Sequence, residues 1–179
     1  MPNNTNNQIK RVFLGFSLDS AQTRTITAIQ AQLPSSVRLV PSANLHMTLA
    51  FLGGATPEQL TALIDNVNQL SKPKFSVTLD TLSHWAKPKI LCLRGRADDR
   101  RLVQLADDTQ QLAAELGLHC SEHHYNPHIT LSRKAKAEVN GIDYQPLTLA
   151  PTKLQLFESC PGANGVEYPT LYSWKLGAL

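Results

Sequence analysis

NLHMTL, residues 44–49, returns later in the chain as NPHITL, residues 126–131. Both copies fit the pattern Asn-x-His-x-Thr-Leu, in which a histidine stands two positions before a threonine. Alternate side chains of a β-strand share a face, so the histidine and the threonine of each copy point the same way. The aliphatic side chains between them point the other way and can cover a core. The repeat therefore predicts two amphipathic strands, each of which presents an imidazole beside a hydroxyl.

The polar faces of the two strands suggest a shared catalytic cleft. If a pseudo-twofold axis relates the strands, both histidines and both threonines converge on one place. Such a cleft offers a proton donor, a proton acceptor and two hydroxyls, and it has no carboxylate that would repel an anion. These groups suit a phosphodiester substrate. The candidate catalytic residues are His46, Thr48, His128 and Thr130, and the residues alone do not say which histidine gives the proton.

The composition is that of an ordinary globular protein. The 179 residues are 42% hydrophobic and 17% charged, which fits a single bilobal domain over residues 1–179 with a loose N-terminus at residues 1–8. The net charge of +3 permits a phosphate-bearing ligand but does not predict the wrapping of a duplex. The three cysteines show no CxxC spacing, the opening residues show no basic-then-apolar pattern that would predict a leader, and no apolar run reaches transmembrane length. We therefore expect reduced thiols, a cytoplasmic location and no membrane association.

The periodicity mixes helices with alternating strands. This mixture favours an α+β fold in two lobes, with antiparallel sheets and helices packed on one face. Gly53 and Gly54 are expected to end the first motif strand, and Asn164-Gly165 to form a hairpin turn before a final strand in which Pro169 requires an irregular or edge position. The expected helices are 19–33, 56–70 and 98–116, and the expected strands are 12–18, 37–40, 44–52, 75–80, 89–94, 127–133, 153–158 and 168–176.

Two other clusters of chemically capable residues carry weaker signals. His119, Cys120, Glu122, His123 and His124 invite a metal site, but Pro127 disfavours a helix that would bring His124 and His128 together, so no metal is expected. Cys120 near His119 is conceivable as a nucleophile, although nothing indicates a lowered thiol pKa. A group of arginines could attract a polyanion or simply be solvated. Its members are Arg94, Arg96, Arg100 and Arg101.

The two motifs, read as residues 44–53 and 127–133, resemble the 2H phosphoesterase superfamily. Within it, they are similar to the bacterial RNA 2′,3′-cyclic phosphodiesterases, also called LigT-type 2′–5′ RNA ligases. The resemblance extends over nearly the whole chain. Its weaker parts are residues 11–13, Trp85, residues 154–159 and residues 168–174.

The resemblance implies a bilobal fold in which two antiparallel sheets surround a central cleft with pseudo-twofold symmetry, and helices lie on the outside. It implies hydrolysis of a terminal 2′,3′-cyclic phosphate on RNA to a 2′-phosphate without metal or cofactor, and it allows reversible 2′–5′ RNA ligation. RNA ends or small cyclic nucleotides would be the substrates of a monomer without an obligate protein partner. A non-catalytic RNA- or nucleotide-binding module on the same fold is the alternative.

The resemblance also implies roles for individual residues. His46 would donate a proton to the leaving oxygen, and His128 would accept one from water. Thr48 and Thr130 would hydrogen-bond the non-bridging oxygens of the phosphate. The expected substrate-binding residues are Arg133, Phe51 and Tyr125.

Parity and resemblance disagree about Arg133. Counting by twos from Leu131 puts Arg133 on the core-facing side, which is an expensive place for a guanidinium, and puts Ser132 beside the histidine. The same count puts Phe51 on the core face and Ala50 on the polar face of the first strand. We expect the second strand to twist, bulge or end at Ser132, so that Arg133 lies partly exposed at the rim of the cleft.

Overall fold

The computed structural model describes residues 8–177, and the rest of the predicted loose terminus, residues 1–7, lies outside the described residues. The helices are α1 (Ser20–Gln30), α2 (Pro57–Gln69) and α3 (Arg100–Glu115), with a short 3₁₀ turn at Ser42–Asn44. The strands are β1 (Lys10–Ser17), β2 (Arg38–Leu39), β3 (His46–Ala55), β4 (Val77–Trp85), β5 (Ile90–Gly95), β6 (His128–Arg133), β7 (Leu147–Leu149), β8 (Lys153–Glu158), β9 (Cys160–Gly162), β10 (Gly165–Glu167) and β11 (Thr170–Lys175).

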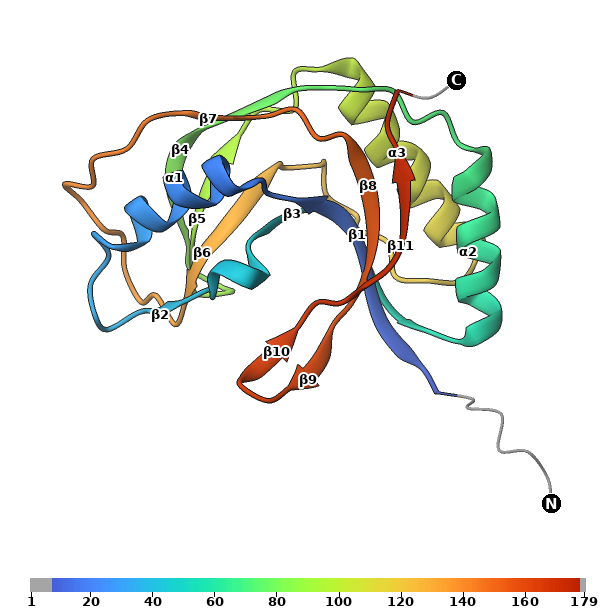
Figure 1. Cartoon of the computed structure of the whole chain (residues 1–179), viewed down its shortest axis with the longest axis horizontal. Helices are drawn as coiled ribbons and strands as arrows, with labels where there is room; N and C mark the ends of the chain where they lie inside the picture. Colours follow the sequence, from blue (N-terminus) through green and yellow to red (C-terminus); the bar gives the residue numbers. More distant parts are fainter. Residues whose placement is uncertain (1–7, 178–179) are drawn as a thin grey trace.

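The strands form one curled antiparallel sheet and a small separate hairpin (Figure 1). The order is β11-β8-β1-β3-β6-β5-β4-β7, with β2 also paired to β6, and β9 with β10 makes the hairpin. The motif strands β3 and β6 are neighbours at the centre and pair through Met47 opposite Ile129. The predicted antiparallel α+β fold is confirmed, and the two expected sheets are two halves that meet at this pair. That residues 1–179 form one domain stays a prediction.

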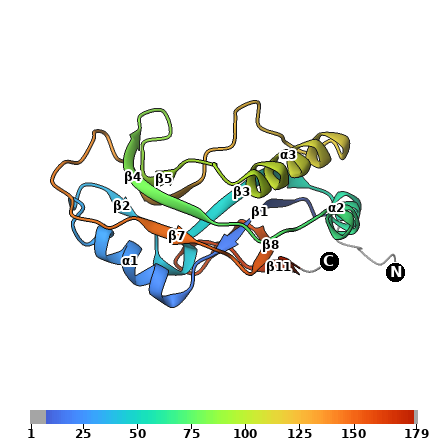
Figure 2. The same cartoon turned by 90° about the horizontal axis from the view of Figure 1, so that it is seen from above.

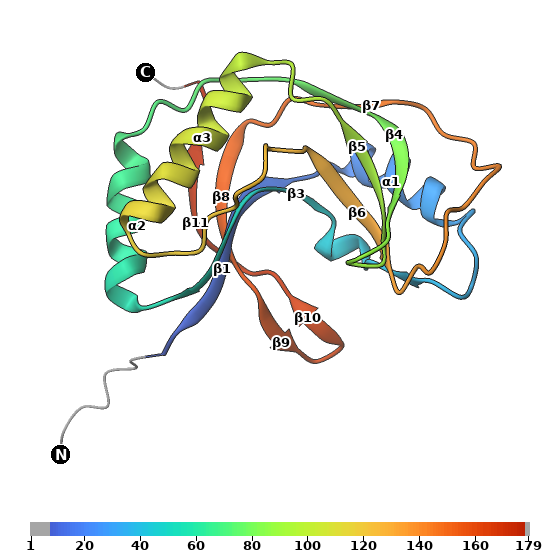
Figure 3. The same ribbon diagram turned by 180° about the vertical axis from the view of Figure 1, so that it is seen from behind.

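The helices begin where the sequence predicted. Asp19 and Thr56 each form a capping box with the glutamine three residues later, and Asp99 caps α3. Gly117, at φ +72°, ends α3 in the left-handed conformation that favours glycine. Helices α2 and α3 lie beside the half that holds β1, β8 and β11, whereas α1 lies beside the half that holds β4, β5 and β6 (Figures 2 and 3).

Both motif strands bulge at the leucine that follows the motif threonine. In β3, Leu49 is the extra residue between the pairs that Thr48 and Ala50 make with β1. In β6, Leu131 is the extra residue between the pairs that Thr130 and Ser132 make with β5. A bulge inserts one residue and so reverses the faces of the side chains that follow. The two copies of the motif are thus alike in backbone irregularity as well as in sequence.

The bulges correct the parity assignments made from the sequence. Ala50 and Ser132, which were expected beside the histidines, are buried. Phe51 was expected on the core face, but it lines a cavity together with His46 and Arg133. The Oγ of Ser132 has no hydrogen-bond partner among the described residues, although it is buried.

Several element boundaries also differ from the sequence prediction. The pair Gly53-Gly54 does not end the first motif strand, because β3 passes through a further irregularity and continues to Ala55. The strand expected at 75–80 begins at Val77 and continues to Trp85. The hairpin turn expected at Asn164-Gly165 falls one residue earlier, at Ala163-Asn164, and joins β9 to β10 in a separate hairpin instead of leading directly into the last strand. Strand β11 starts after Pro169 and lies at an edge of the sheet, as the proline predicted.

Gly15 makes the bulge in β3 possible. A Cβ at Gly15 would lie 2.7 Å from the carbonyl oxygen of Met47, so Gly15→Ala must push the backbone of β3 away. We expect the free energy of unfolding, measured with urea, to fall by about 1–3 kcal/mol. Gly54→Ala is the control, because a Cβ there meets the end of the Ile9 side chain, which can rotate away. Equal losses in the two variants would contradict this account.

Candidate active site

The two motif histidines are anchored by the same hydrogen bond. The Nδ1–H of His46 donates to the carbonyl oxygen of Asn44 at 2.7 Å, and the Nδ1–H of His128 donates to that of Asn126 at 2.8 Å. A carbonyl oxygen can only accept, so Nδ1 carries the hydrogen in both neutral rings. The Nε2 atom of each ring is therefore the one that can take up or release a proton. The asparagine of the repeated motif contributes through its backbone.

The surroundings of the two rings differ. The Nε2 of His46 lies 3.0 Å from the Oγ1 of Thr48. The ring of His46 also packs against Phe13, at a centroid distance of 4.8 Å, and against Tyr168, at 5.2 Å. His128 instead packs on Trp85, with ring centroids 4.5 Å apart. His46 thus lies in an aromatic cage, whereas His128 has one aromatic neighbour in the described chain.

Burial lowers the pKa of both histidines below the ordinary value. In each ring the hydrogen bond from Nδ1 to the backbone carbonyl acts in the opposite direction and raises the pKa. The positive charges of His128 and Arg133 lower the pKa of His46 further. Both rings are therefore mainly neutral at pH 7 in the free protein. A bound anion would favour the imidazolium form, so binding of a phosphate and protonation of this pair are coupled.

Two adjoining cavities of about 540 Å³ each meet at Thr48 and Phe51, which line both. The first contains His46, and the second contains His128. The predicted site residues in the first cavity are His46, Thr48, Phe51, Thr130 and Arg133. Those in the second are Thr48, Phe51, Tyr125 and His128. The single cleft expected from the sequence thus has two compartments, one for each histidine.

The cavities differ in charge. The first is lined by Arg11, Arg38 and Arg133, and no Asp or Glu is among the described residues that line it. The second is lined by Asp107 and Glu122. A polyanion is therefore attracted to the His46 side of the site and repelled from the His128 side.

Tyr125 supports the backbone of the site. Its hydroxyl donates to the carbonyl oxygen of Thr48 at 2.8 Å, immediately before the bulge at Leu49. Burial raises the pKa of Tyr125 well above its ordinary value, so the hydroxyl remains a neutral donor. Because this hydroxyl already donates its hydrogen to the backbone of β3, the substrate contact predicted for Tyr125 would come from its ring.

Phe51 presents a partly covered ring. The guanidinium of Arg11 lies over it at 4.7 Å from the ring centroid, and His119 meets it edge-on at 5.5 Å. Arg11 and Phe51 together form a flat, positively charged surface of the kind on which nucleobases stack.

Sequence reasoning missed four residues at the site. Arg11, Arg38 and Phe13 come from strands that pair with the motif strands, and no local pattern indicated that they would reach the cavity. The side chain of Asn44 was also missed; its Nδ2 donates to the carbonyl oxygen of Val166 in the β9–β10 hairpin at 2.9 Å. Arg11, Phe13 and Tyr168 had a signal only as parts of the resemblance, in residues 11–13 and 168–174.

The histidine- and cysteine-rich segment before β6 does not gather into a metal site in the described chain. Within residues 8–177, no three His, Cys, Asp or Glu side chains lie close enough to hold one ion. His123 and His124 line the second cavity, and Cys120 is exposed. Burial raises the pKa of Cys92 to about 12, so its thiol stays protonated.

The expected arginine group does not line the cavities, although Arg94 lies opposite His128 in the β5–β6 register. Arg94 donates from Nε to the Oγ of Ser83 at 2.7 Å, and Arg101 pairs with Asp99 at 2.9 Å. Neither of these two arginines lines a compartment that holds a motif histidine, and the same is true of Arg96 and Arg100.

Comparison with known proteins agrees with this geometry. Residues 17–92 match the family model of LigT-like phosphoesterases. The RNA 2′,3′-cyclic phosphodiesterase of Escherichia coli K12 is 33% identical over 147 residues, which are 80% of this chain and 82% of that protein. This chain belongs to the LigT-like phosphoesterase family. The resemblance seen in its sequence is confirmed.

Further relatives extend the comparison. The RNA 2′,3′-cyclic phosphodiesterase of Thermotoga maritima is 24% identical over 74% of this chain and 76% of its own length. The crystal structure of E. coli LigT complexed with 3′-AMP superposes with a TM-score of 0.86 at 30% identity, covering 96% of this chain and 100% of that one. E. coli LigT complexed with phosphate has a TM-score of 0.82 at 29% identity, with 96% and 99% covered. Among the helices described for this chain, none has the length and apolar character of a bilayer span.

The charge of Arg133 gives a prediction about His46 alone. Arg133→Gln removes one of the positive charges that lower the pKa of His46, so that pKa should rise. The ring C–H signals of both histidines, followed by NMR against pH, would measure it. His128 is the internal control, because Arg133 is not among the causes of its shift. An unchanged His46, or an equal rise at His128, would show that Arg133 does not act on His46 directly.

Proposed function

We propose that this chain hydrolyses the terminal 2′,3′-cyclic phosphate of RNA to a 2′-phosphate, by acid–base catalysis between His46 and His128 and without a metal. The observation that carries the proposal is the matched pair of histidines, each anchored at Nδ1 so that Nε2 can exchange a proton, in adjoining cavities that are both lined by Thr48. Membership of the LigT-like phosphoesterase family supports it, as do relatives named RNA 2′,3′-cyclic phosphodiesterase. The phosphate and 3′-AMP complexes of E. coli LigT fit the same chemistry.

The unequal charge of the cavities supports a division of roles. An RNA strand is a polyanion, so it favours the cavity with three arginines, where His46 lies. The terminal ribose and its 3′-oxygen then lie on the His46 side of the phosphorus. In a displacement at phosphorus the attacking and leaving oxygens are roughly in line, which places the water on the His128 side. We therefore assign His46 as the proton donor and His128 as the acceptor.

The reaction balances with these groups. The Nε2 of His128 takes a proton from water as the water oxygen bonds to phosphorus. The bond between phosphorus and the 3′-oxygen breaks, and Nε2–H of His46 gives its proton to that oxygen. A positioned acid or base contributes typically about 10²–10⁴-fold in rate. The roles proposed for Thr48 and Thr130 are hydrogen bonds that their hydroxyls donate to the non-bridging oxygens.

Two variations of this function follow from the same site. Attack of a 5′-hydroxyl on the cyclic phosphate, in place of water, would join RNA ends through a 2′–5′ linkage, and the reverse of that step would cleave the linkage. A binding module without turnover would not need both histidines, and this chain has both motifs intact. We further propose that the protein acts as a monomer in the cytoplasm, which suits its three free cysteines.

The decisive assay is ring opening of an oligonucleotide that ends in a 2′,3′-cyclic phosphate, in excess EDTA. The wild-type protein should act, and His46→Ala and His128→Ala should each lower kcat by at least about 10²-fold while remaining folded. His84→Ala is the control, since the Nε2 of His84 bonds the carbonyl oxygen of Ala135 away from both cavities and its loss should leave the rate nearly unchanged. Activity that disappears in EDTA and returns with a divalent ion would overturn the metal-free mechanism, and full activity of either variant would overturn the paired mechanism.

The roles of the histidines can be separated with a substrate that carries sulfur in place of the 3′-oxygen. A thiol has a pKa near 8.5, far below that of an alcohol, so a thiolate leaves without a proton donor. The defect of His46→Ala should therefore shrink by at least about tenfold on this substrate, within the range that an acid supplies. The defect of His128→Ala should persist. The opposite pattern would exchange the two roles.

A further inference from the structure

We propose that Arg38 and Arg133 form a second phosphate site, which binds the phosphodiester preceding the terminal nucleotide of the strand. The inference rests on the proposed function, because the terminal nucleotide must occupy the His46 cavity. Its consequence is a preference for a cyclic phosphate at the end of a strand over the same group on a single nucleoside.

The two arginines face each other across a strand pair. Arg38 of β2 lies directly opposite Arg133 of β6 in the antiparallel register, and both line the His46 cavity. Directly opposed residues of antiparallel strands have Cβ atoms about 4.5–5.5 Å apart, and like charges in such a pair destabilise the sheet. An anion bound between the two guanidinium groups would turn this repulsion into attraction.

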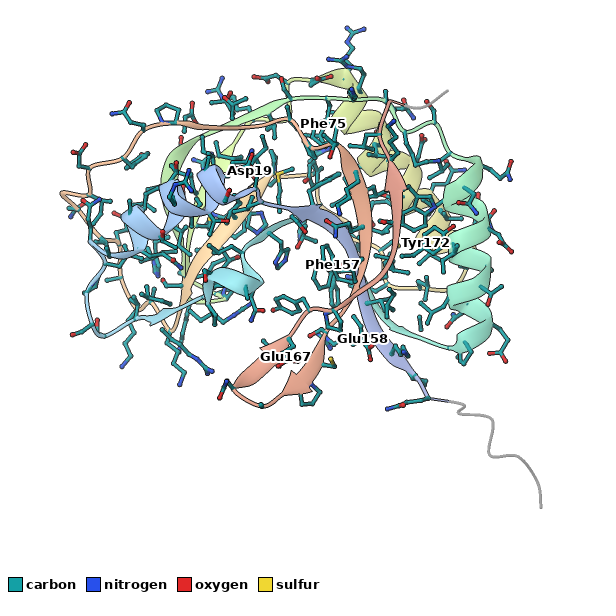
Figure 4. All side chains as sticks on the ribbon, viewed as in Figure 1. Asp19, Phe75, Phe157, Glu158, Glu167 and Tyr172 are labelled. Atoms are coloured by element: carbon teal, nitrogen blue, oxygen red, sulfur yellow. The ribbon has the colours of Figure 1, made fainter. Side chains whose placement is uncertain are left out.

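Carboxylates within the described chain do not neutralise the pair. The ion pairs of residues 8–177 join Lys10 to Glu158 and Arg101 to Asp99, and neither includes Arg38 or Arg133. The two acidic residues nearest the hairpin in sequence, Glu158 and Glu167, are labelled in Figure 4. Glu158 is engaged by Lys10 at 3.5 Å. The carboxyl group of Glu167 packs against Gly162 within its own hairpin, where it would meet an added Cβ. The positive charge of the arginine pair is therefore available to a ligand.

The position of the pair suits the neighbouring phosphate. Arg133 lies at the end of β6, beyond Thr130 and the bulge at Leu131. Its charge acts on His46, whereas Arg38 is not among the charges that shift the pKa of that ring. Arg133 lies on the strand that carries Thr130, whereas Arg38 lies on the neighbouring β2, one strand away from that threonine, and both line the cavity. A strand that leaves the His46 cavity past Arg133 meets Arg38 next.

The β9–β10 hairpin closes the far side of this path. The Nη2 of Arg38 lies 3.8 Å from the position that a Cβ would take on Gly165 at the hairpin turn. Leu39 and Val166, each 44% exposed, line the same cavity beside the arginine pair. These apolar side chains offer a surface for the base of the preceding nucleotide, and the arginines offer charge for its phosphate.

The test compares three substrates: a nucleoside 2′,3′-cyclic phosphate, a dinucleotide with the same end, and that dinucleotide with a neutral methylphosphonate linkage. For the wild-type protein, kcat/KM should be about tenfold higher for the dinucleotide than for the mononucleoside, as one hydrogen bond to a charged group can supply. The methylphosphonate should lose this advantage. In Arg38→Gln the ratio of dinucleotide to mononucleoside should fall to about one, whereas Arg100→Gln, an exposed arginine of α3, should keep the wild-type ratio.

The outcomes separate this inference from the proposed function. A mononucleoside and a dinucleotide that are used equally well by the wild type would overturn the second phosphate site and leave the proposed function standing. If Arg38→Gln keeps the wild-type ratio of kcat/KM between dinucleotide and mononucleoside, the second phosphate site would also be overturned. This holds as well where kcat/KM for both substrates falls in parallel. An advantage kept by the methylphosphonate would assign the effect to the base and not to the phosphate. If the wild type acted on none of the three substrates, the proposed function itself would fail.

Discussion

The pairing of β3 with β6 is the interaction on which the site depends. Met47 and Ile129 face each other at the centre of the sheet, and both are fully buried. Their aliphatic side chains belong to one core, so the histidines that flank them emerge on the opposite face. The two halves of the molecule meet here, with β1 on the outer side of β3 and β5 on the outer side of β6. A shift of one residue in this register would turn one histidine into the core and dismantle the pair.

The matched bulges adapt this simple strand pair to its ligand. In a strand without a bulge, the side chain two positions after each motif threonine would face the cleft. The extra leucine in each strand moves that place one residue further along, to Phe51 in β3 and Arg133 in β6. The same backbone device thus presents an aromatic ring in one half and a guanidinium in the other. Rings stack on bases and guanidinium groups bind phosphates, so the two halves offer different parts of a nucleotide their preferred contacts.

Chemical asymmetry is imposed on a symmetric motif by its surroundings. Both imidazoles hold the same tautomer through the same carbonyl bond, yet His46 is enclosed by aromatic rings and lies near the charges of His128 and Arg133. Arginines line the cavity on one side and carboxylates line the cavity on the other, which is the basis of the direction proposed for the substrate. An enzyme of this kind needs one acid and one base, and two identical residues can serve only if the environment distinguishes them.

The sequence by itself determined the motif strands, the capped helices, the antiparallel α+β class and the candidate catalytic residues. These follow from local rules, namely the period of two along a strand, the capping residues at Asp19 and Thr56, and the repetition of the motif. The tertiary structure alone decided where Phe51, Ser132 and Arg133 point, because a bulge depends on the strand beside it and leaves no mark in the period of its own strand. It alone brought Arg11, Arg38 and the β9–β10 hairpin to the cavity. Their place is set by pairing between segments distant in sequence, and no local pattern of side chains encodes such a contact.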